Sequence, residues 1–124
     1  MNYMYAFEKL QVWHDSRALV GKIYAVTEQI PGAEKYGLTS RMRRAAVSVV
    51  SNIAEGTGRT SPKDQAHFYQ LAYSSIIELL NQLIISKDLS YIKESELATV
   101  REIIEMISNK LNALRNSSLK RINK

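Results

Sequence analysis

Two histidines are the residues best suited to metal or acid–base chemistry in this chain of 124 residues, which has no cysteine. His14 and His67 lie far apart in the sequence, and neither is followed three or four residues later by a histidine or a carboxylate. A helical metal site needs such a neighbour, because residues at these spacings share one face. A catalytic triad also needs a nucleophile and an orienting acid, for which no pattern exists here. We expect two surface or structural histidines, no catalytic residue and no metal.

Two further segments partly match chemical motifs. Gly56-Thr57-Gly58-Arg59 has the glycines of a phosphate loop, but it follows a helical pattern and lacks the lysine and hydroxyl residue at Walker spacing. A helix end followed by a turn explains this segment better. Glu78 stands almost alone among the acids of its helix, and the Glu-x-x-His motif of di-iron bundles is absent. We predict no cofactor, no small-molecule substrate and no enzymatic activity.

A polar row between residues 41 and 59 is the most unusual pattern in the chain. Its members recur at steps of three and four residues among mostly small or apolar neighbours: Arg41, Arg44, Ser48, Asn52, Glu55 and Arg59. Such a row can face solvent, form a hydrogen-bonded seam between subunits in which Arg44 or Arg59 pairs with Glu55, or face a ligand. Breaking a buried ion pair costs about 3–5 kcal/mol, which favours a structural ion-pair network over a binding site.

Apolar residues at helical spacing predict the elements that position these side chains. Pro31-Gly32 ends the first helical pattern, and Ser61-Pro62-Lys63-Asp64 begins the third. In that second segment a serine can cap the helix, proline suits the first helical position and an acid lies at the positive end of the dipole. The expected helices span residues 8–30, 38–57, 61–88 and 93–115, followed by a basic, fraying tail at 116–124.

Four helices of roughly 20 residues, each about 30 Å long and joined by short loops, predict an antiparallel up-down-up-down four-helix bundle. The length of the chain suits a single domain with one core. The N-terminus has no secretory signal, and no apolar stretch approaches the roughly 18 residues of a membrane-spanning helix. With no cysteine, nothing requires an oxidising compartment. We therefore expect a cytoplasmic protein without a membrane partner.

The predicted third helix has two neighbouring apolar rows, which exceed the single stripe of about 100° that a helix buries in an isolated bundle. The second row indicates a partner subunit, and broad packing within the chain is the alternative. The candidate oligomer contacts are Tyr69, Tyr73, Ile77 and Ile84.

The net charge of +5 comes from the C-terminal end of the chain. Residues 1–109 contain 12 basic and 12 acidic residues, so this part is neutral. The excess basic residues are Lys110, Arg115, Lys120, Arg121 and Lys124. They can complement the negative end of the last helix or contact phosphates. No aromatic residue follows Tyr91, so nucleic-acid binding by the tail would be electrostatic.

Three segments of the chain are distinctive: Leu10-Gln11-Val12-Trp13, residues 36–48 and above all Ser51-Asn52-Ile53-Ala54-Glu55-Gly56. These segments resemble the four-helix bundle proteins encoded within bacterial 23S rRNA intervening sequences. Residues 68–69, 74–78 and 87–92 fit the same pattern, so the match covers nearly the whole chain. The resemblance implies a homopentamer around a central channel, in agreement with the surplus apolar row, and a family without established enzymatic activity.

The chain is also similar in fold to the accessory variability determinant proteins of diversity-generating retroelements. Those proteins bind nucleic acid and a reverse transcriptase through a strongly basic pentamer, which suggests RNA, DNA or a nucleic-acid-processing protein as partner. This chain differs in its neutral body, so we expect weak binding of RNA or a ribonucleoprotein. The alternative is a protein-interaction scaffold that never contacts nucleic acid. The candidate phosphate contacts are Arg41, Arg43, Arg44, Arg59 and Lys63.

Overall fold

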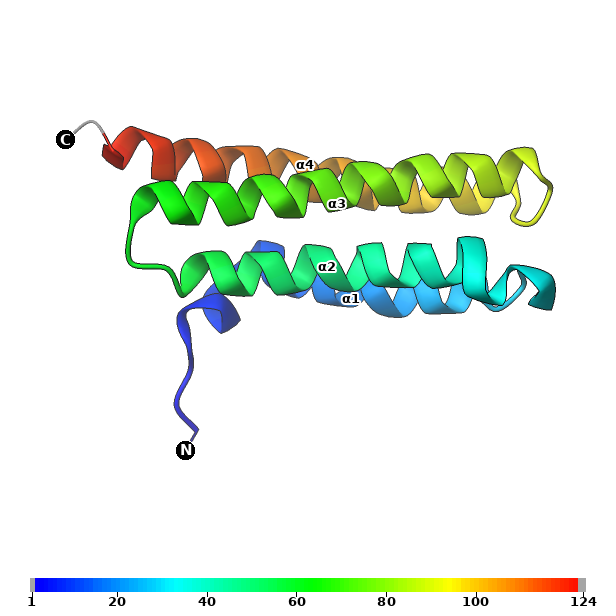
Figure 1. Cartoon of the computed structure of the whole chain (residues 1–124), viewed down its shortest axis with the longest axis horizontal. Coiled ribbons are helices and arrows are strands. Elements are labelled where there is room, and N and C mark those ends of the chain that lie inside the picture. The colour runs from blue at the N-terminus through cyan, green and yellow to red at the C-terminus, as the bar shows by residue number, and fades with distance from the viewer. Residues whose placement is uncertain (1, 123–124) are drawn as a thin grey trace.

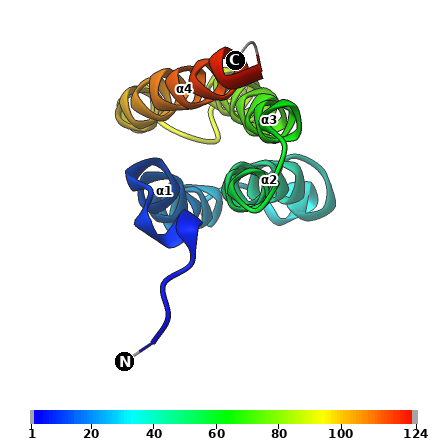
Figure 2. The same cartoon turned by 90° about the vertical axis from the view of Figure 1, so that its left-hand side faces the viewer.

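Four α-helices make up most of residues 2–122, the part of the chain that the computed structural model describes. They are α1 (Gln11–Thr27), α2 (Ser40–Thr57), α3 (Pro62–Asp88) and α4 (Glu94–Ile122). The helices lie side by side as a bundle (Figure 1). Viewed along its length, the bundle has α1 beside α2 in one layer and α3 beside α4 in the other (Figure 2). Residues 2–122 contain no β-strand, and the predicted all-α bundle of four helices is confirmed.

The first connection of the bundle is longer than predicted, because α1 is shorter than residues 8–30. Leu10 has an extended backbone, with φ −86° and ψ 125°, and it separates a 3₁₀ turn at Ala6–Lys9 from α1. α1 then ends at Thr27, before the proline that was expected to stop it. A kink at Gly37, with φ −109° and ψ −108°, precedes the start of α2.

Local capping fixes both ends of α3. The Ser61 hydroxyl accepts a hydrogen bond from the backbone N–H of Asp64 at 3.2 Å, and Pro62 is the first helical residue, so the predicted start signal is confirmed. At the other end, Ser90 has φ 64° and the N–H of Tyr91 donates to the carbonyl of Ser86 at 2.9 Å. This left-handed residue ends the helix and turns the chain toward α4.

α4 continues past its predicted end at residue 115, because its last turns pack against the start of α3. Ser118 is buried, Arg115 donates to the side chain of Gln70, and Arg121 donates to the side chain of Gln65. The expected fraying of residues 116–122 is therefore wrong. Lys124 lies outside the described residues.

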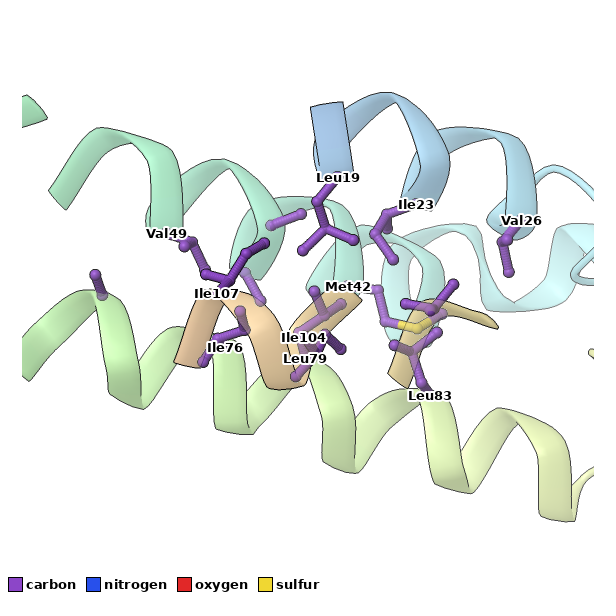
Figure 3. Packing of buried hydrophobic residues seen from close by; sticks show 14 of the residues in the cluster. Leu19, Ile23, Val26, Met42, Val49, Ile76, Leu79, Leu83, Ile104 and Ile107 are labelled. Atoms are coloured by element: carbon purple, nitrogen blue, oxygen red, sulfur yellow. The ribbon is translucent and has the colours of Figure 1, made fainter. Parts of the chain in front are cut away.

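The hydrophobic core runs the length of the bundle and takes side chains from all four helices (Figure 3). Among its buried residues are Leu19 and Ile23 of α1, Met42 and Val49 of α2, Ile76, Leu79 and Leu83 of α3, and Ile104 and Ile107 of α4. Full burial of such a side chain contributes about 1.5–3 kcal/mol. This core holds α2 against α3 and so fixes the spacing of the polar groups on their outer faces.

The bundle itself uses much of the second apolar row of α3. Tyr69 is only 4% exposed and packs against Gly56 of α2, so the bundle leaves little of its side chain for a contact with another subunit. Tyr73 and Ile84 are half-buried against the core. Ile77 is 43% exposed and is the one candidate contact with a large open surface.

Lys110 joins α4 to α1 through an ion pair. Its Nζ lies 2.6 Å from Oδ2 of Asp15, a carboxylate whose side chain is 14% exposed. Burial raises the pKa of Asp15, but hydrogen bonds from Lys110 and Gln11, together with the nearby charges of Lys110 and His14, outweigh burial and leave the pKa below its ordinary value of 3.8. Lys110 therefore stabilises the packing of α4 against α1.

Replacing Lys110 with methionine should lower the free energy of unfolding by about 1–2 kcal/mol at pH 7. A carboxyl with a depressed folded-state pKa adds stability above its unfolded pKa, and this contribution is lost as the pH falls through the folded value. The difference between wild type and Lys110→Met should therefore shrink below about pH 4. Urea titrations at pH 7 and pH 3 test this, with the exposed Lys120→Met as control. A difference that stays the same at both pH values would contradict the assignment.

Candidate functional site

The structure separates the five candidate phosphate contacts into three locations, and Arg43 faces α1. Its guanidinium donates to the Thr27 hydroxyl at 2.9 Å and pairs with Glu28 at 3.1 Å. It also lies 4.5 Å from the ring centre of Tyr24. Because these contacts occupy the guanidinium within the chain, they argue against Arg43 as a phosphate contact.

Arg59 and Lys63 lie near the connection between α2 and α3. The Arg59 guanidinium is 4.3 Å from the ring centre of Phe68, and Lys63 is exposed in the first turn of α3. Fifteen residues separate Arg59 from Arg44, which corresponds to roughly 20 Å along a helix. These two cations are therefore remote from the arginines at the start of α2.

Arg41 and Arg44 come together on a groove of about 460 Å³ between α2 and α3. Its lining residues are Arg41, Arg44, Ala45, Ser48, Ser75, Glu78 and Gln82. Each helix contributes polar side chains at successive steps of three and four residues, so each presents one continuous polar wall. The volume is within the usual range of ligand sites, about 300–1,000 Å³.

Hydrogen bonds fix the groove where the two walls meet. The hydroxyls of Ser48 and Ser75 lie 2.9 Å apart, and the Asn52 amide donates to the Ser48 hydroxyl at 3.0 Å. On the α3 wall, Nε2 of Gln82 donates to Oε1 of Glu78 at 3.1 Å, and Gln82 is buried. The polar row along α2 therefore does not simply face solvent, because Ser75 of α3 is hydrogen-bonded to Ser48 of the row.

The charged groups of the groove are not ion-paired within the described part of the chain. The three ion pairs found in residues 2–122 are Arg43–Glu28, Lys87–Asp88 and Lys110–Asp15. Glu55 belongs to none of them, so the predicted pairing of Arg44 or Arg59 with Glu55 does not form inside one subunit. Pairing between subunits stays a prediction. The groove therefore offers two guanidinium groups and one carboxylate to a ligand.

Neither histidine lines this groove. Nε2 of His14 donates to the backbone carbonyl of Glu8 at 2.6 Å, and the exposed His67 ring lies edge-on to Phe68. In residues 2–122 no cluster of three histidine, aspartate or glutamate side chains could hold a metal ion. None of the helices described is both long and apolar enough to cross a membrane.

Comparison with known proteins identifies the family of this chain. The family model described as 23S rRNA-intervening sequence protein matches residues 8–113. The chain belongs to this family. The resemblance seen in the sequence is confirmed, and the matched residues include both walls of the groove.

The fold has a counterpart among solved structures. A crystal structure of a protein of unknown function from the S23 ribosomal protein family of Bacteroides thetaiotaomicron is similar, with a TM-score of 0.75 and 17% sequence identity. The match covers 84% of this chain and 97% of the other chain. At this identity the likeness concerns the fold alone. No curated protein matches the chain.

Proposed function

We propose that this chain is a non-enzymatic scaffold that binds RNA weakly, as an antiparallel up-down-up-down bundle assembled into a ring-like homo-oligomer. The observation that carries the proposal is the groove, where the exposed Arg41 and Arg44 have no ion-pair partner among residues 2–122. Arginine suits a phosphate because its planar guanidinium can donate two parallel hydrogen bonds. Several grooves on one oligomer would strengthen binding to a single RNA.

RNA is proposed as the partner because of the two arginines of the groove and the resemblance in fold to nucleic-acid-binding proteins, since the family description refers to where these proteins are encoded and names no ligand. Weak binding follows from the charge distribution, because the first 109 residues are neutral and Lys110 and Arg115 are engaged within the chain. Arg41 and Arg44 supply the main phosphate contacts, and Arg59 and Lys63 extend them along α2 and α3. Binding of this kind depends steeply on salt, since each contact releases counterions.

Reversing the charge of the groove with Arg41→Glu and Arg44→Glu together should weaken RNA binding about tenfold near 0.1 M salt. The loss of the phosphate contact should also make the slope of log affinity against log salt shallower by at least about 0.7, the value for one phosphate of a single strand. Fluorescence anisotropy with a labelled RNA over a salt series measures both quantities.

The matched control is Arg101→Glu, which reverses an exposed arginine on α4 outside the groove. It changes the net charge of a subunit by two where the double variant changes it by four, so it corrects for the general electrostatic effect. Thermal unfolding of each variant checks the fold. An unchanged RNA affinity in a folded double variant would contradict the assignment of the groove.

The oligomer is tested by light scattering of nuclease-treated protein. A mass near five times the 14.1 kDa of one chain supports a pentameric ring. A monomer at all concentrations would contradict the assembly, although one chain could still bind RNA.

The second candidate function is a protein-interaction scaffold, and the N-terminal arm favours it. Tyr3, Met4 and Tyr5 are exposed on a segment that projects from the bundle (Figure 1). Aromatic anchors of this kind supply much of the binding energy at protein interfaces. A partner that is captured after nuclease treatment and lost with Tyr3→Ala and Tyr5→Ala, but retained by the control Tyr36→Ala at another exposed tyrosine, would favour this function over RNA binding.

A further inference from the structure

The groove between α2 and α3 is not uniformly basic, and its mixed charge bears on the nucleic acid it accepts. Arg41 and Arg44 line its α2 wall, and Glu78 lines its α3 wall. A ligand that is only anionic is attracted by the first wall and repelled by the second. The groove therefore favours a ligand that carries a hydrogen-bond donor close to its negative charge.

Gln82 orients the carboxylate of Glu78 through a hydrogen bond. Its Nε2 donates to Oε1 of Glu78 at 3.1 Å, and burial of Gln82 restricts its side chain. The opposite amide orientation would bring two acceptor oxygens together, so the hydrogen-bond network fixes the assignment. Oε2 of the exposed Glu78 stays free to accept a hydrogen bond from a ligand.

The floor of the groove has the same preference for donors. Oε1 of Gln82 is buried and has no hydrogen-bond partner within residues 2–122. The hydroxyls of Ser48 and Ser75 are already hydrogen-bonded to each other. Adding another acceptor-only group, such as a second phosphate, would leave Oε1 of Gln82 unsatisfied, whereas a donor group of the ligand could satisfy it.

The backbone of RNA supplies both required groups within one sugar. Its 2′-hydroxyl is a donor on the carbon next to the one that carries the 3′-phosphate, whereas DNA has the phosphate without this hydroxyl. A hydroxyl that donates to a carboxylate forms a short, charge-assisted hydrogen bond. No aromatic side chain lines the groove, so base stacking does not contribute there.

We infer that the α2–α3 groove distinguishes RNA from DNA, with Arg41 and Arg44 holding a backbone phosphate and Glu78 accepting a hydrogen bond from the adjacent ribose 2′-hydroxyl. This inference rests on the proposed RNA binding and adds its selectivity. Recognition is confined to the backbone, so it does not depend on base sequence. Gln82 is a positioning residue for the Glu78 carboxylate.

The test compares three 20-nucleotide strands of one unstructured sequence: RNA, DNA and fully 2′-O-methylated RNA. We expect the wild-type protein to bind RNA at least about tenfold more tightly than DNA, the effect of one charge-assisted hydrogen bond. The 2′-O-methylated strand has no donor at this position and should bind like DNA. Glu78→Met removes the acceptor together with the repulsion, so it should raise DNA affinity and bring the ratio of RNA to DNA affinity close to one.

The matched control is Glu102→Met, which removes an exposed carboxylate of α4 that does not line the groove. It should raise RNA and DNA affinity equally and preserve their ratio. Equal wild-type affinity for RNA and DNA, or 2′-O-methylated RNA binding as tightly as RNA, would overturn the inference while leaving RNA binding itself intact. Glu78→Met with an unchanged ratio would also overturn it. Failure of both RNA and DNA to bind would instead overturn the proposed function.

Discussion

Alanine in place of Gly56 should lower the free energy of unfolding by about 2 kcal/mol, although replacing glycine with alanine stabilises most helix interiors. An added Cβ would lie 2.5 Å from Cε1 of Tyr69 and 3.2 Å from Cβ of Phe68. The buried Tyr69 ring cannot swing into solvent to relieve the overlap. The cost is thus at the upper end of overpacking, about 3 kcal/mol, and the helix-propensity gain of about 1 kcal/mol offsets only part of it.

The matched control is Gly21→Ala, because Gly21 is a helical glycine with no heavy atom within 4 Å of an added Cβ. This change should raise stability by about 0.5–1 kcal/mol. Denaturant titration of the two variants measures the difference. Tyr69→Leu should partly relieve the penalty in a Gly56→Ala background, because the two residues share one contact. If Gly56→Ala were as stable as Gly21→Ala, the close approach of α2 and α3 would be contradicted.

The sequence predicted the helices well because their apolar residues repeat at helical spacing and Ser61 supplies a local start signal. The errors at the ends have tertiary causes. Residues 116–122 look like a polar tail, but Ser118 is buried and Arg115 and Arg121 hydrogen-bond to α3. No local pattern announces such partners, because Arg115 and Gln70 are 45 positions apart.

The candidate site was only partly accessible from the sequence. Arg41 and Arg44 belong to the polar row of α2, and the structure brings them together. Arg43 is not part of that row. Its position in the helical repeat therefore already indicated that its side chain faces another helix. The opposite wall could not be assigned, because pairing α2 with the correct side of α3 requires the tertiary fold. Even so, Glu78 was a visible signal as an isolated acid on a long helix.

The second apolar row of α3 shows the same limit. Its width correctly indicates more apolar surface than one stripe, but a pattern does not tell whether that surface is covered by the same chain or by another. Tyr69 is covered by α2, where Gly56 leaves room for its ring. Ile77 is left exposed beside the buried Ile76. A comparison of these two neighbouring isoleucines therefore distinguishes packing within the bundle from contacts between subunits.

Ile76→Ala should lower the free energy of unfolding by about 3–4 kcal/mol, and Ile77→Ala by less than about 1 kcal/mol in the isolated subunit. The two changes remove the same atoms at adjacent positions of one helix, so their intrinsic helix propensities cancel in the comparison. Ile76 is 0% exposed and sits in the core, whereas Ile77 is 43% exposed. Denaturant titration at low protein concentration, where subunits are separate, measures the difference.

If Ile77 lies between subunits, its contribution should appear only when the protein assembles. Wild-type unfolding would then shift with protein concentration, because association stabilises the folded subunit. Ile77→Ala would reduce that shift, and the mass measured by light scattering would fall toward one chain at concentrations where the wild type stays assembled. Ile76→Ala would weaken folding at every concentration. If the Ile77→Ala variant assembled like the wild type, Ile77 would be excluded as an important contact. Contacts through the α1 and α4 faces would then be the next to test.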